Sequence, residues 1–368
     1  MRISPLREKL AAAGAVFRTR HGIEVVSHFG DPRAECAAVR DAAALSDYSF
    51  TRVFTLPETP GIDLLDALLA GNVPKIRFGR VLHTFLADAE GRLVADCFVA
   101  NNDQEFVFVC ETIVPDADLD AALAFAGPES PVKDLTPDHV VLSLDGFKSW
   151  EIAKKIFGAD VVGLPYLSIE NYAFAGEPVR FIRAGKTSEF GYLLIAPVKI
   201  APALFDCLKA GVEERGGRLV GAEAHDALRL EGRFFNIFRE GERVRDPLPL
   251  GLQWMIDLEK EKFSGSAAIY QRRSEGLQQK IIGLAAEANC TQLTTGAPIF
   301  LAESRVGEVV ADGISQVLNR PLALGLLPLE LAYSGLQFRV GGADGPVIRS
   351  ISMPPIMPKS LTVKLDEM

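Results

Sequence analysis

One carboxylate in the sequence stands on a strand-like segment among apolar neighbours, where it could take part in acid–base chemistry. In the segment Arg92–Val99, alternation places Val94, Asp96 and Phe98 on one face of the predicted strand. A carboxylate with apolar neighbours on both faces loses much of its hydration, and an isolated buried charge is costly without partners. Asp96 is therefore a candidate functional acid or base.

A histidine on the preceding strand could supply the partner. If Asp88–Gly91 forms a four-residue hairpin loop, Ala87 pairs with Arg92, and the same register places His83 directly across from Asp96. A His–Asp pair on an inner sheet face is a candidate acid–base couple. The alternatives are a solvent-facing strand with an incidental acid, or a register shifted by one residue, which would part the two side chains.

The other common catalytic signatures are missing. The sequence contains no nucleophile elbow, P-loop, dinucleotide-binding loop or H-E-x-x-H zinc helix, and the Gly-rich segment 341–345 lacks the Rossmann spacing. The 5 histidines show no metal-ligand spacing, and the 5 cysteines never form a C-x-x-C pair. We therefore expect no metal site, and the scattered cysteines fit a reducing cytoplasm.

The overall composition excludes further classes. The 368 residues carry 39 Lys and Arg against 48 Asp and Glu, a formal net charge of −9. An acidic chain is a poor match for bulk nucleic-acid binding, which needs a basic surface. No run approaches the ~18 apolar residues of a membrane helix, and the short, Ala-rich stretch 10–17 predicts an amphipathic helix rather than a signal peptide. A cytoplasmic protein without nucleic-acid or membrane partners is expected.

The elements that must position Asp96 and His83 are readable from periodicity and turn residues. Strands are expected at Val81–Ala87, Arg92–Ala100, Glu105–Cys110, Val140–Leu144, Pro178–Ala184 and Gly191–Ala196. Helices are expected at 31–47, 116–126, 147–158, 200–215 and 221–235. This mixture indicates an α+β arrangement with antiparallel sheets.

The character of the sequence changes near Gly276, where a domain boundary is predicted. Short strand candidates follow, with turn residues between them, as in a small β-barrel or sandwich. They are Lys280–Ala285, Gly296–Leu301, Arg305–Ala311, Leu322–Pro328, Gln337–Arg339 and Pro346–Ser352.

Four segments, in the same order, resemble those of one known family. Gly79–Thr84 followed by Gly91–Val99 resembles its G-x-x-x-Y-T…G-G-x-x-D-D-L-x-V segment, and Leu164–Tyr166 resembles its L-P-Y/F. Arg183–Tyr192 resembles R-T-G-Y-T-G-E-x-G-x-E, and the run from 226 to 265 resembles D-x-L-R-L-E…P-x-E-A-G-L-x-W…D-L-x-K…F-x-G. The chain thus looks like a divergent member of the glycine-cleavage T-protein (aminomethyltransferase) family.

The resemblance implies an architecture. In that family a three-domain ring holds tetrahydrofolate in its central cleft, the middle domain is inserted into the first, and the last domain is a small β-barrel. Applied to this chain, the first α+β domain comprises residues 1–50 and 136–245. The inserted middle domain comprises 51–135 and 246–278, and the barrel 279–368.

It also implies roles for single residues. Asp96 matches an acid near folate N5 and N10, Glu189 a glutamate that recognises the pterin ring, and Arg229 an arginine near the folate glutamate tail. Tyr166 and Trp254 match aromatic positions that line the folate cleft. Without the family, Glu189 would be a solvated turn residue, Arg229 part of a surface ion pair, and the two aromatic residues core packing.

The sequence departs from the family pattern in the parts expected to meet the one-carbon donor. His83 and Lys186 replace tyrosines, and Ser188 replaces a glycine, which reduces the freedom of the backbone there. These changes suggest a donor other than the aminomethyl-lipoyl arm of a carrier protein.

The function that the resemblance implies is an enzymatic, tetrahydrofolate-dependent one-carbon transfer to folate N5, most simply aminomethyltransferase-like. The donor would be a small molecule or a lipoyl carrier protein. Asp96 would orient the folate amines, accept a proton or stabilise positive charge, and His83 would tune that charge or protonate a leaving amine or thiol. The alternatives are a folate-dependent demethylase of S-, N- or O-methyl compounds, a non-catalytic folate-binding protein, and a degenerate member that binds no folate.

Overall fold

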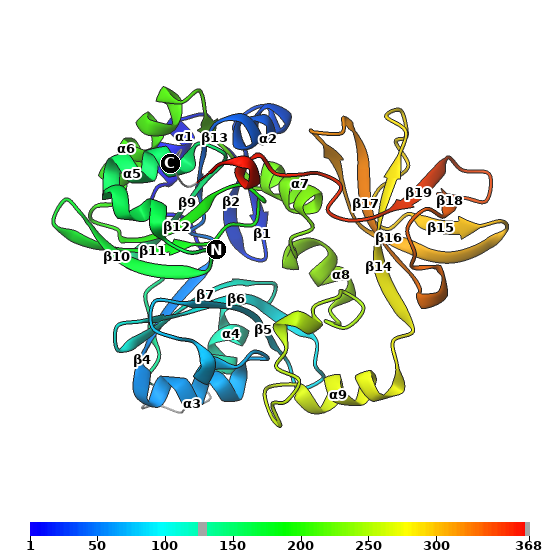
Figure 1. Cartoon of the computed structure of the whole chain (residues 1–368), viewed down its shortest axis with the longest axis horizontal. Helices are drawn as coiled ribbons and strands as arrows, with labels where there is room; N and C mark the ends of the chain where they lie inside the picture. Colours follow the sequence, from blue (N-terminus) through cyan, green and yellow to red (C-terminus); the bar gives the residue numbers. More distant parts are fainter. Residues whose placement is uncertain (124–130, 365–368) are drawn as a thin grey trace.

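Two β-sheets and a closed barrel organise the chain, which is described over residues 1–123 and 131–364 of a computed structural model (Figure 1). The larger sheet has the strand order β10-β11-β12-β9-β3-β13. Its neighbouring strands run antiparallel, except that β13 is parallel to β3. The strands are β10 (Ser168–Phe174), β11 (Glu177–Arg183), β12 (Gly191–Pro197), β9 (His139–Asp145), β3 (Ala44–Asp47) and β13 (Arg218–Leu219).

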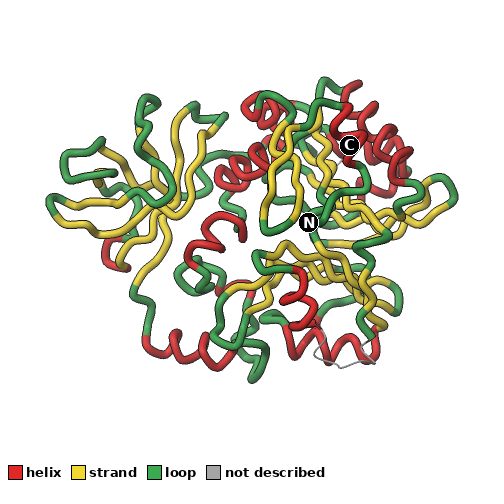
Figure 2. Tube along the Cα trace, turned by 180° about the vertical axis from the view of Figure 1, so that it is seen from behind, coloured by secondary structure: helices red, strands yellow, loops and turns green. Residues whose placement is uncertain are grey.

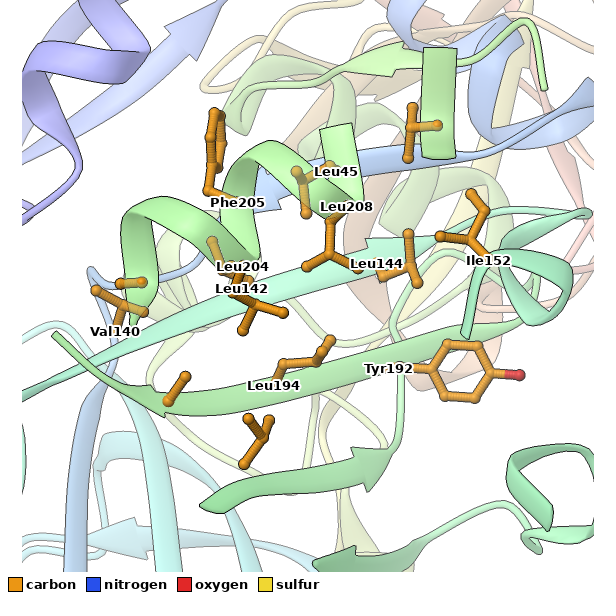
Figure 3. Packing of buried hydrophobic residues seen from close by; sticks show 14 of the residues in the cluster. Leu45, Val140, Leu142, Leu144, Ile152, Tyr192, Leu194, Leu204, Phe205 and Leu208 are labelled. Carbon is orange, nitrogen blue, oxygen red and sulfur yellow. The ribbon is translucent and has the colours of Figure 1, made fainter. Parts of the chain in front are cut away.

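Three helices cover one face of this sheet. They are α1 (Arg7–Ala12), α5 (Ser149–Phe157) and α6 (Ala201–Glu214). Helix α6 repeats apolar residues three and four positions apart, which gives it one apolar stripe, and Leu204 and Leu208 from that stripe pack on Leu142 and Leu194 of the sheet (Figure 3). The other face of the sheet is turned towards the second sheet.

The second sheet has the order β5-β6-β7-β4-β8 and is antiparallel throughout. Its strands are β5 (Val81–Ala87), β6 (Leu93–Asn102), β7 (Glu105–Thr112), β4 (Arg52–Pro57) and β8 (Lys133–Asp134), and its helices are α3 (Glu58–Leu68) and α4 (Asp116–Leu123). The helix expected at 116–126 is thus present as far as Leu123, and the rest of that prediction lies outside the described residues.

The inner faces of the two sheets share one apolar core. Phe98 and Val109 from the second sheet meet Ile182 and Ile195 from the first in this core. A short bridge between Arg80 and Ser168 joins the edges of the two sheets. The inner faces are therefore held together, and side chains from both can meet beside the core.

The remaining elements connect the sheets to the barrel. A hairpin of β1 (Val16–Arg20) and β2 (Ile23–His28) lies with α2 (Pro32–Asp41) and α7 (Ala222–Gly232) beside the first sheet. A π-helical turn (Ile237–Gly241) continues into α8 (Glu242–Val244), and α9 (Ser266–Glu275) leads to the barrel. Short 3-10 turns occupy Val73–Lys75, Ala159–Gly163, Gln253–Met255, Leu329–Leu331 and Lys359–Thr362.

The terminal β-barrel expected from the sequence is confirmed. It closes in the order β14-β17-β16-β15-β18-β19, with β14 paired to β19, and Figure 2 shows it standing apart from the two sheets. Its strands are β14 (Gln279–Ala286), β15 (Pro298–Leu301), β16 (Ser304–Ser315), β17 (Arg320–Pro328), β18 (Gln337–Val340) and β19 (Val347–Ile351). The α+β class is confirmed with it, whereas the division into 1–50 plus 136–245, 51–135 plus 246–278 and 279–368 stays a proposal.

Two expected helices are shorter than the sequence suggested. Helix α2 begins after Asp31, whose side chain accepts from two amides of the first turn, but it ends at Asp41, and Ala44–Asp47 forms strand β3. The N-terminal helix ends at Ala12, and the chain from Val16 forms β1. Alanine-rich stretches carry little periodic contrast, so pairing with neighbouring strands decides where these helices stop.

Candidate active site

The predicted pair of His83 and Asp96 is present, although the register that predicted it is wrong. His83 lies opposite Phe98, and Asp96 opposite Phe85. Two displacements of one residue cause this: Arg92 belongs to the turn, and Val94 has no partner, because Ala87 pairs with Leu93 and Leu86 with Ala95. The two shifts add up to two residues, which is the side-chain period of a strand, so His83 and Asp96 still point to the same face of the sheet. They are diagonal neighbours, with His83 Nε2 and Asp96 Oδ1 2.7 Å apart.

A lysine binds the second oxygen of Asp96. The Nζ atom of Lys186 lies 2.5 Å from Asp96 Oδ2 and 3.1 Å from Glu111 Oε1, and its side chain is only 5% exposed. Burial alone would raise the pKa of Asp96, but the charges of Lys186 and His83 and their hydrogen bonds lower it below its usual value. Asp96 is therefore ionised at neutral pH, with both oxygens occupied.

Glu111 and Arg229 extend the cluster. Arg229 donates from its two Nη atoms to the two oxygens of Glu111 at 2.7 and 2.6 Å, and from Nη2 to the hydroxyl of Tyr48 at 2.8 Å. Burial alone would raise the pKa of Glu111, but the positive charges of Arg229 and Lys186 have the larger combined effect. The pKa of Glu111 is therefore lowered. Arg229 was expected near a ligand's carboxylate tail, but its Nη atoms are committed to protein partners and the residue is 2% exposed.

The turn between β11 and β12 carries Lys186 into the cluster. Its two ends approach closely at Gly185 and Gly191, where a Cβ atom on Gly191 would lie 2.7 Å from the Cα of Gly185. Arg40 of α2 holds the middle of the turn by donating from Nη1 to the carbonyl of Thr187 at 2.6 Å. The two glycines of the turn and the distant Arg40 thus fix one lysine.

A buried aspartate supports the same turn from β9. Ser143 donates to Asp145 in a short hydrogen bond, and Thr187 Oγ1 lies 3.4 Å from the other oxygen. Burial raises the pKa of Asp145 to about 6, because these hydrogen bonds do not replace the hydration of a full charge. Asp145 therefore titrates near neutrality beside the site.

Glu189 faces away from Asp96, towards the end of the described chain. Its carboxylate accepts from Arg40 Nη1 at 3.2 Å, from the amide and hydroxyl of Ser360 at 2.8 and 2.6 Å, and from the amide of Lys359 at 3.3 Å. These last two residues belong to a segment that we call the strap (residues 352–364), which runs in red from the barrel past α7 to the first sheet (Figure 1). The structure thus does not place Glu189 with Asp96, His83 and Lys186.

Two large exposed aromatic side chains lie beside the cluster. Trp254 is 64% exposed and Tyr166 is 49% exposed. The Trp254 ring stands edge-on to His83, with ring centroids 5.3 Å apart, and the charge of Asp96 adds to partial burial in raising the pKa of Tyr166. A cavity of about 410 Å³ is lined by Trp254, Arg233 and Lys280 among others, but not by the residues of the cluster. Trp254 thus adjoins the cluster through His83, and Tyr166 lies close enough to Asp96 to respond to its charge.

The cluster offers N–H donors and a balanced set of charges. Two carboxylates, Asp96 and Glu111, face two cations, Lys186 and Arg229. Within the described ranges, no group of three or more His, Cys, Asp or Glu side chains has the geometry to hold a metal ion. Nor does any helix there have the length and apolar character needed to cross a bilayer. Proton transfer and orientation of a bound molecule are the chemistry that such a site supports.

Glu111 could have been found from the sequence, because it continues the alternation of the strand, but it lies one residue beyond the predicted end of that strand. Alternation from Val107 and Val109 leads to Glu111, which lies directly opposite Asp96. The strand was expected to end at Cys110, and it continues to Thr112. Tyr48 carried no comparable signal, because its contact with the cluster depends on the packing of a distant helix.

Comparison with known proteins identifies relatives along most of the chain. Residues 6–260 match the model of the GCVT N-terminal domain family. An aminomethyltransferase of Synechococcus sp. (strain RCC307) is 27% identical over 94% of this chain and 96% of its own length. Another from Streptomyces coelicolor is 28% identical, covering 89% of each chain.

A solved structure shares the fold. The glycine cleavage system aminomethyltransferase T from Bartonella henselae superposes with a TM-score of 0.82, covering 97% of this chain and 98% of that chain, at 22% sequence identity. The arrangement of sheets and terminal barrel is therefore that of a T-protein.

Proposed function

Since this chain belongs to the GCVT N-terminal domain family, we propose that it is a transferase that moves a one-carbon unit onto tetrahydrofolate. The observation that carries the proposal is the buried cluster of His83, Asp96 and Lys186 next to the exposed rings of Tyr166 and Trp254. Flat aromatic walls above a few fixed polar groups are typical of sites that bind a ring-shaped ligand.

Two aromatic side chains, Tyr166 and Trp254, support the fit of tetrahydrofolate to this site. The exposed faces of Tyr166 and Trp254 would hold its flat rings, and Asp96 would lie beneath them. When bound, tetrahydrofolate supplies the nucleophilic nitrogen N5. The folate contacts predicted for Glu189 and Arg229 stay proposals, and they require both side chains to give up the partners described above.

The protein's own groups would act on protons. Asp96 holds His83 in place through Nε2, and the same carboxylate fixes the ammonium of Lys186. Asp96 would accept the proton that the acceptor nitrogen loses, and Lys186 or His83 would give one to the leaving group, so that the cluster as a whole neither gains nor loses a proton. Orientation of donor and acceptor above them would supply most of the acceleration.

A folate-dependent demethylase is the second candidate. The leading reaction is aminomethyltransferase-like, with a lipoyl carrier protein or a small molecule as donor. The replacement of two family tyrosines by His83 and Lys186, which both bind Asp96, favours the alternative, because it changes the part of the site expected to meet the donor. The folate product separates the two: methylene-tetrahydrofolate supports the first and methyl-tetrahydrofolate the second.

The variant Asp96→Asn tests the role of the carboxylate. Asparagine keeps the size of the side chain but removes the charge that fixes Lys186 and His83, so turnover should fall at least tenfold, roughly 1.4 kcal/mol of barrier. Tetrahydrofolate should still raise the melting temperature of the variant, because ligand binding to the native state alone stabilises it.

The matched control is Asp206→Asn, which removes an exposed carboxylate paired with Lys9 and should leave turnover unchanged. Undiminished turnover in Asp96→Asn would exclude the proposed role. No rise in melting temperature for the unmodified chain at saturating tetrahydrofolate would instead contradict folate binding itself.

A further inference from the structure

We propose that Lys186 determines donor specificity by cancelling the charge of Asp96, so that the site prefers one-carbon donors that are uncharged at the transferring centre over ammonium and sulfonium donors. This inference rests on the proposed function and names the class of donor that the same site accepts. It starts from the position of a single ammonium group.

Lys186, together with His83, shields Asp96 from a cationic ligand. Its Nζ atom lies 2.5 Å from Oδ2, while His83 Nε2 lies 2.7 Å from Oδ1. The carboxylate is 0% exposed, whereas the residues that cover it expose 5% and 7% of their side chains. A ligand beside the cluster therefore cannot contact the carboxylate directly unless Lys186 or His83 moves.

The charge balance of the cluster depends on the same residue. Arg229 neutralises Glu111 through two hydrogen bonds, and Lys186 neutralises Asp96. Without the ammonium, the cluster would hold one unbalanced negative charge beneath Trp254 and Tyr166. Aromatic faces and a buried carboxylate together attract cations, so the lysine removes an attraction that the rest of the site would otherwise provide.

The geometry shows that the lysine is held in place. Its ammonium lies 5.3 Å from the centre of the Phe98 ring and also contacts Glu111 at 3.1 Å. The turn that carries it is fixed by the bond from Arg40 to the carbonyl of Thr187. A lysine held on three sides cannot swing into solvent to admit a cation without breaking these contacts.

The experiment compares two probes of nearly equal shape. Choline carries a quaternary ammonium group, and 3,3-dimethylbutan-1-ol is its uncharged isostere. Binding is read from the fluorescence of Trp254 in a Trp150→Phe background, because these are the 2 tryptophans of the chain. In the unmodified cluster we expect the alcohol to bind more tightly than choline.

The variant Lys186→Met keeps the length of the side chain and removes the charge. We expect the ratio of the two dissociation constants to shift at least tenfold in favour of choline, whereas Lys186→Arg should keep the original ratio. Lys260→Met is the matched control, because Lys260 is also a mostly buried lysine, paired with Asp66 away from the cluster. It should lower stability without changing the ratio.

Each result decides the proposal. Tighter binding of choline than of the alcohol by the unmodified cluster would overturn it, even if no variant folds. An unchanged ratio in folded Lys186→Met would also overturn it. The proposed function is tested separately by the thermal shift with tetrahydrofolate, so a failure of folate binding is distinguishable from a failure of charge selection.

Discussion

At the scale of single residues, the site is built from charges that are buried in pairs. Removing one member of such a pair leaves an uncompensated charge in a poorly hydrated place, which costs more than the pair itself contributes. Asp96 and Glu111 each contact Lys186, and Glu111 also contacts Arg229. The four side chains therefore act as one unit, and single substitutions in it will not be additive.

Asp145 gives the pH prediction at this scale. Its pKa is about 6 in the folded protein, because of burial, against about 3.9 for an unfolded aspartate. The folded state thus binds the proton more tightly than the unfolded state does. This binding adds to the free energy of unfolding in full below about pH 4, and the contribution is lost as the pH rises through 6. Replacing Asp145 by Asn should therefore reduce the fall in unfolding free energy between pH 5 and pH 7 by about 1 kcal/mol.

Urea denaturation at several pH values measures this difference directly. Asp206→Asn, on an exposed ion pair, should keep the original pH profile. A profile for Asp145→Asn that matches the parent would show that Asp145 does not titrate in this range.

At the scale of elements, the turn from β11 to β12 is the part that the site depends on most. The closest approach in it is between Gly185 and Gly191, and a methyl group on Gly191 would also lie 2.8 Å from Asp145 Oδ1. Backbone atoms cannot move aside as a flexible side chain does, so the strand ends must separate and Lys186 must shift. Gly191→Ala should lower the unfolding free energy by ~1–3 kcal/mol.

Gly163→Ala provides the comparison, because a methyl group there would meet no atom within 4 Å. Unfolding in urea should show little change for this variant. Equal stabilities of the two variants would mean that the turn tolerates a wider spacing than the structure indicates.

The sequence predicted local features of these elements better than the contacts between them. The sequence correctly predicted the two strands of the hairpin and that Asp96 and His83 lie on the same face of the sheet. Both follow from alternation, which depends only on neighbouring residues. The register of the hairpin was not predicted correctly, because no residue pattern indicates that Arg92 belongs to the turn or that Val94 has no partner.

The contact of Lys186 with Asp96 could not be predicted at all, because it spans 90 residues and depends on how two sheets pack. Tyr166 and Trp254 are exposed rather than part of a core, and their place in a folate cleft stays a prediction. For Glu189 and Arg229, a sequence motif identified the positions, but the direction in which each side chain points follows from tertiary contacts.

At the scale of the whole molecule, the strap ties the barrel end of the chain to the first sheet. Arg40 lies at the centre of this connection, since it binds Glu189 beneath the strap and Glu231 of α7. Glu231 in turn accepts from Ser315 and Gln316 of the barrel. One guanidinium thus joins the turn that carries Lys186, the strap and the barrel.

A double-mutant cycle tests whether the strap stabilises the fold through Glu189. Ser360→Ala and Glu189→Gln each remove part of the same hydrogen-bonded group, so their effects on unfolding free energy should be less than additive by ~1–2 kcal/mol. Ser352→Ala, at an exposed serine of the strap, should combine additively with Glu189→Gln. Additive behaviour of Ser360→Ala would show that the contact contributes no coupling.

The strap also sets an order of events during biosynthesis. Arg40 and Glu189 are translated well before Ser360, yet Glu189 gains its amide and hydroxyl donors only when residues 359 and 360 have emerged. Until then only Arg40, of these partners, can bind Glu189, and water takes the place of the strap while the earlier elements can already fold. The last contacts that cover Glu189 are therefore made only when the chain is nearly complete.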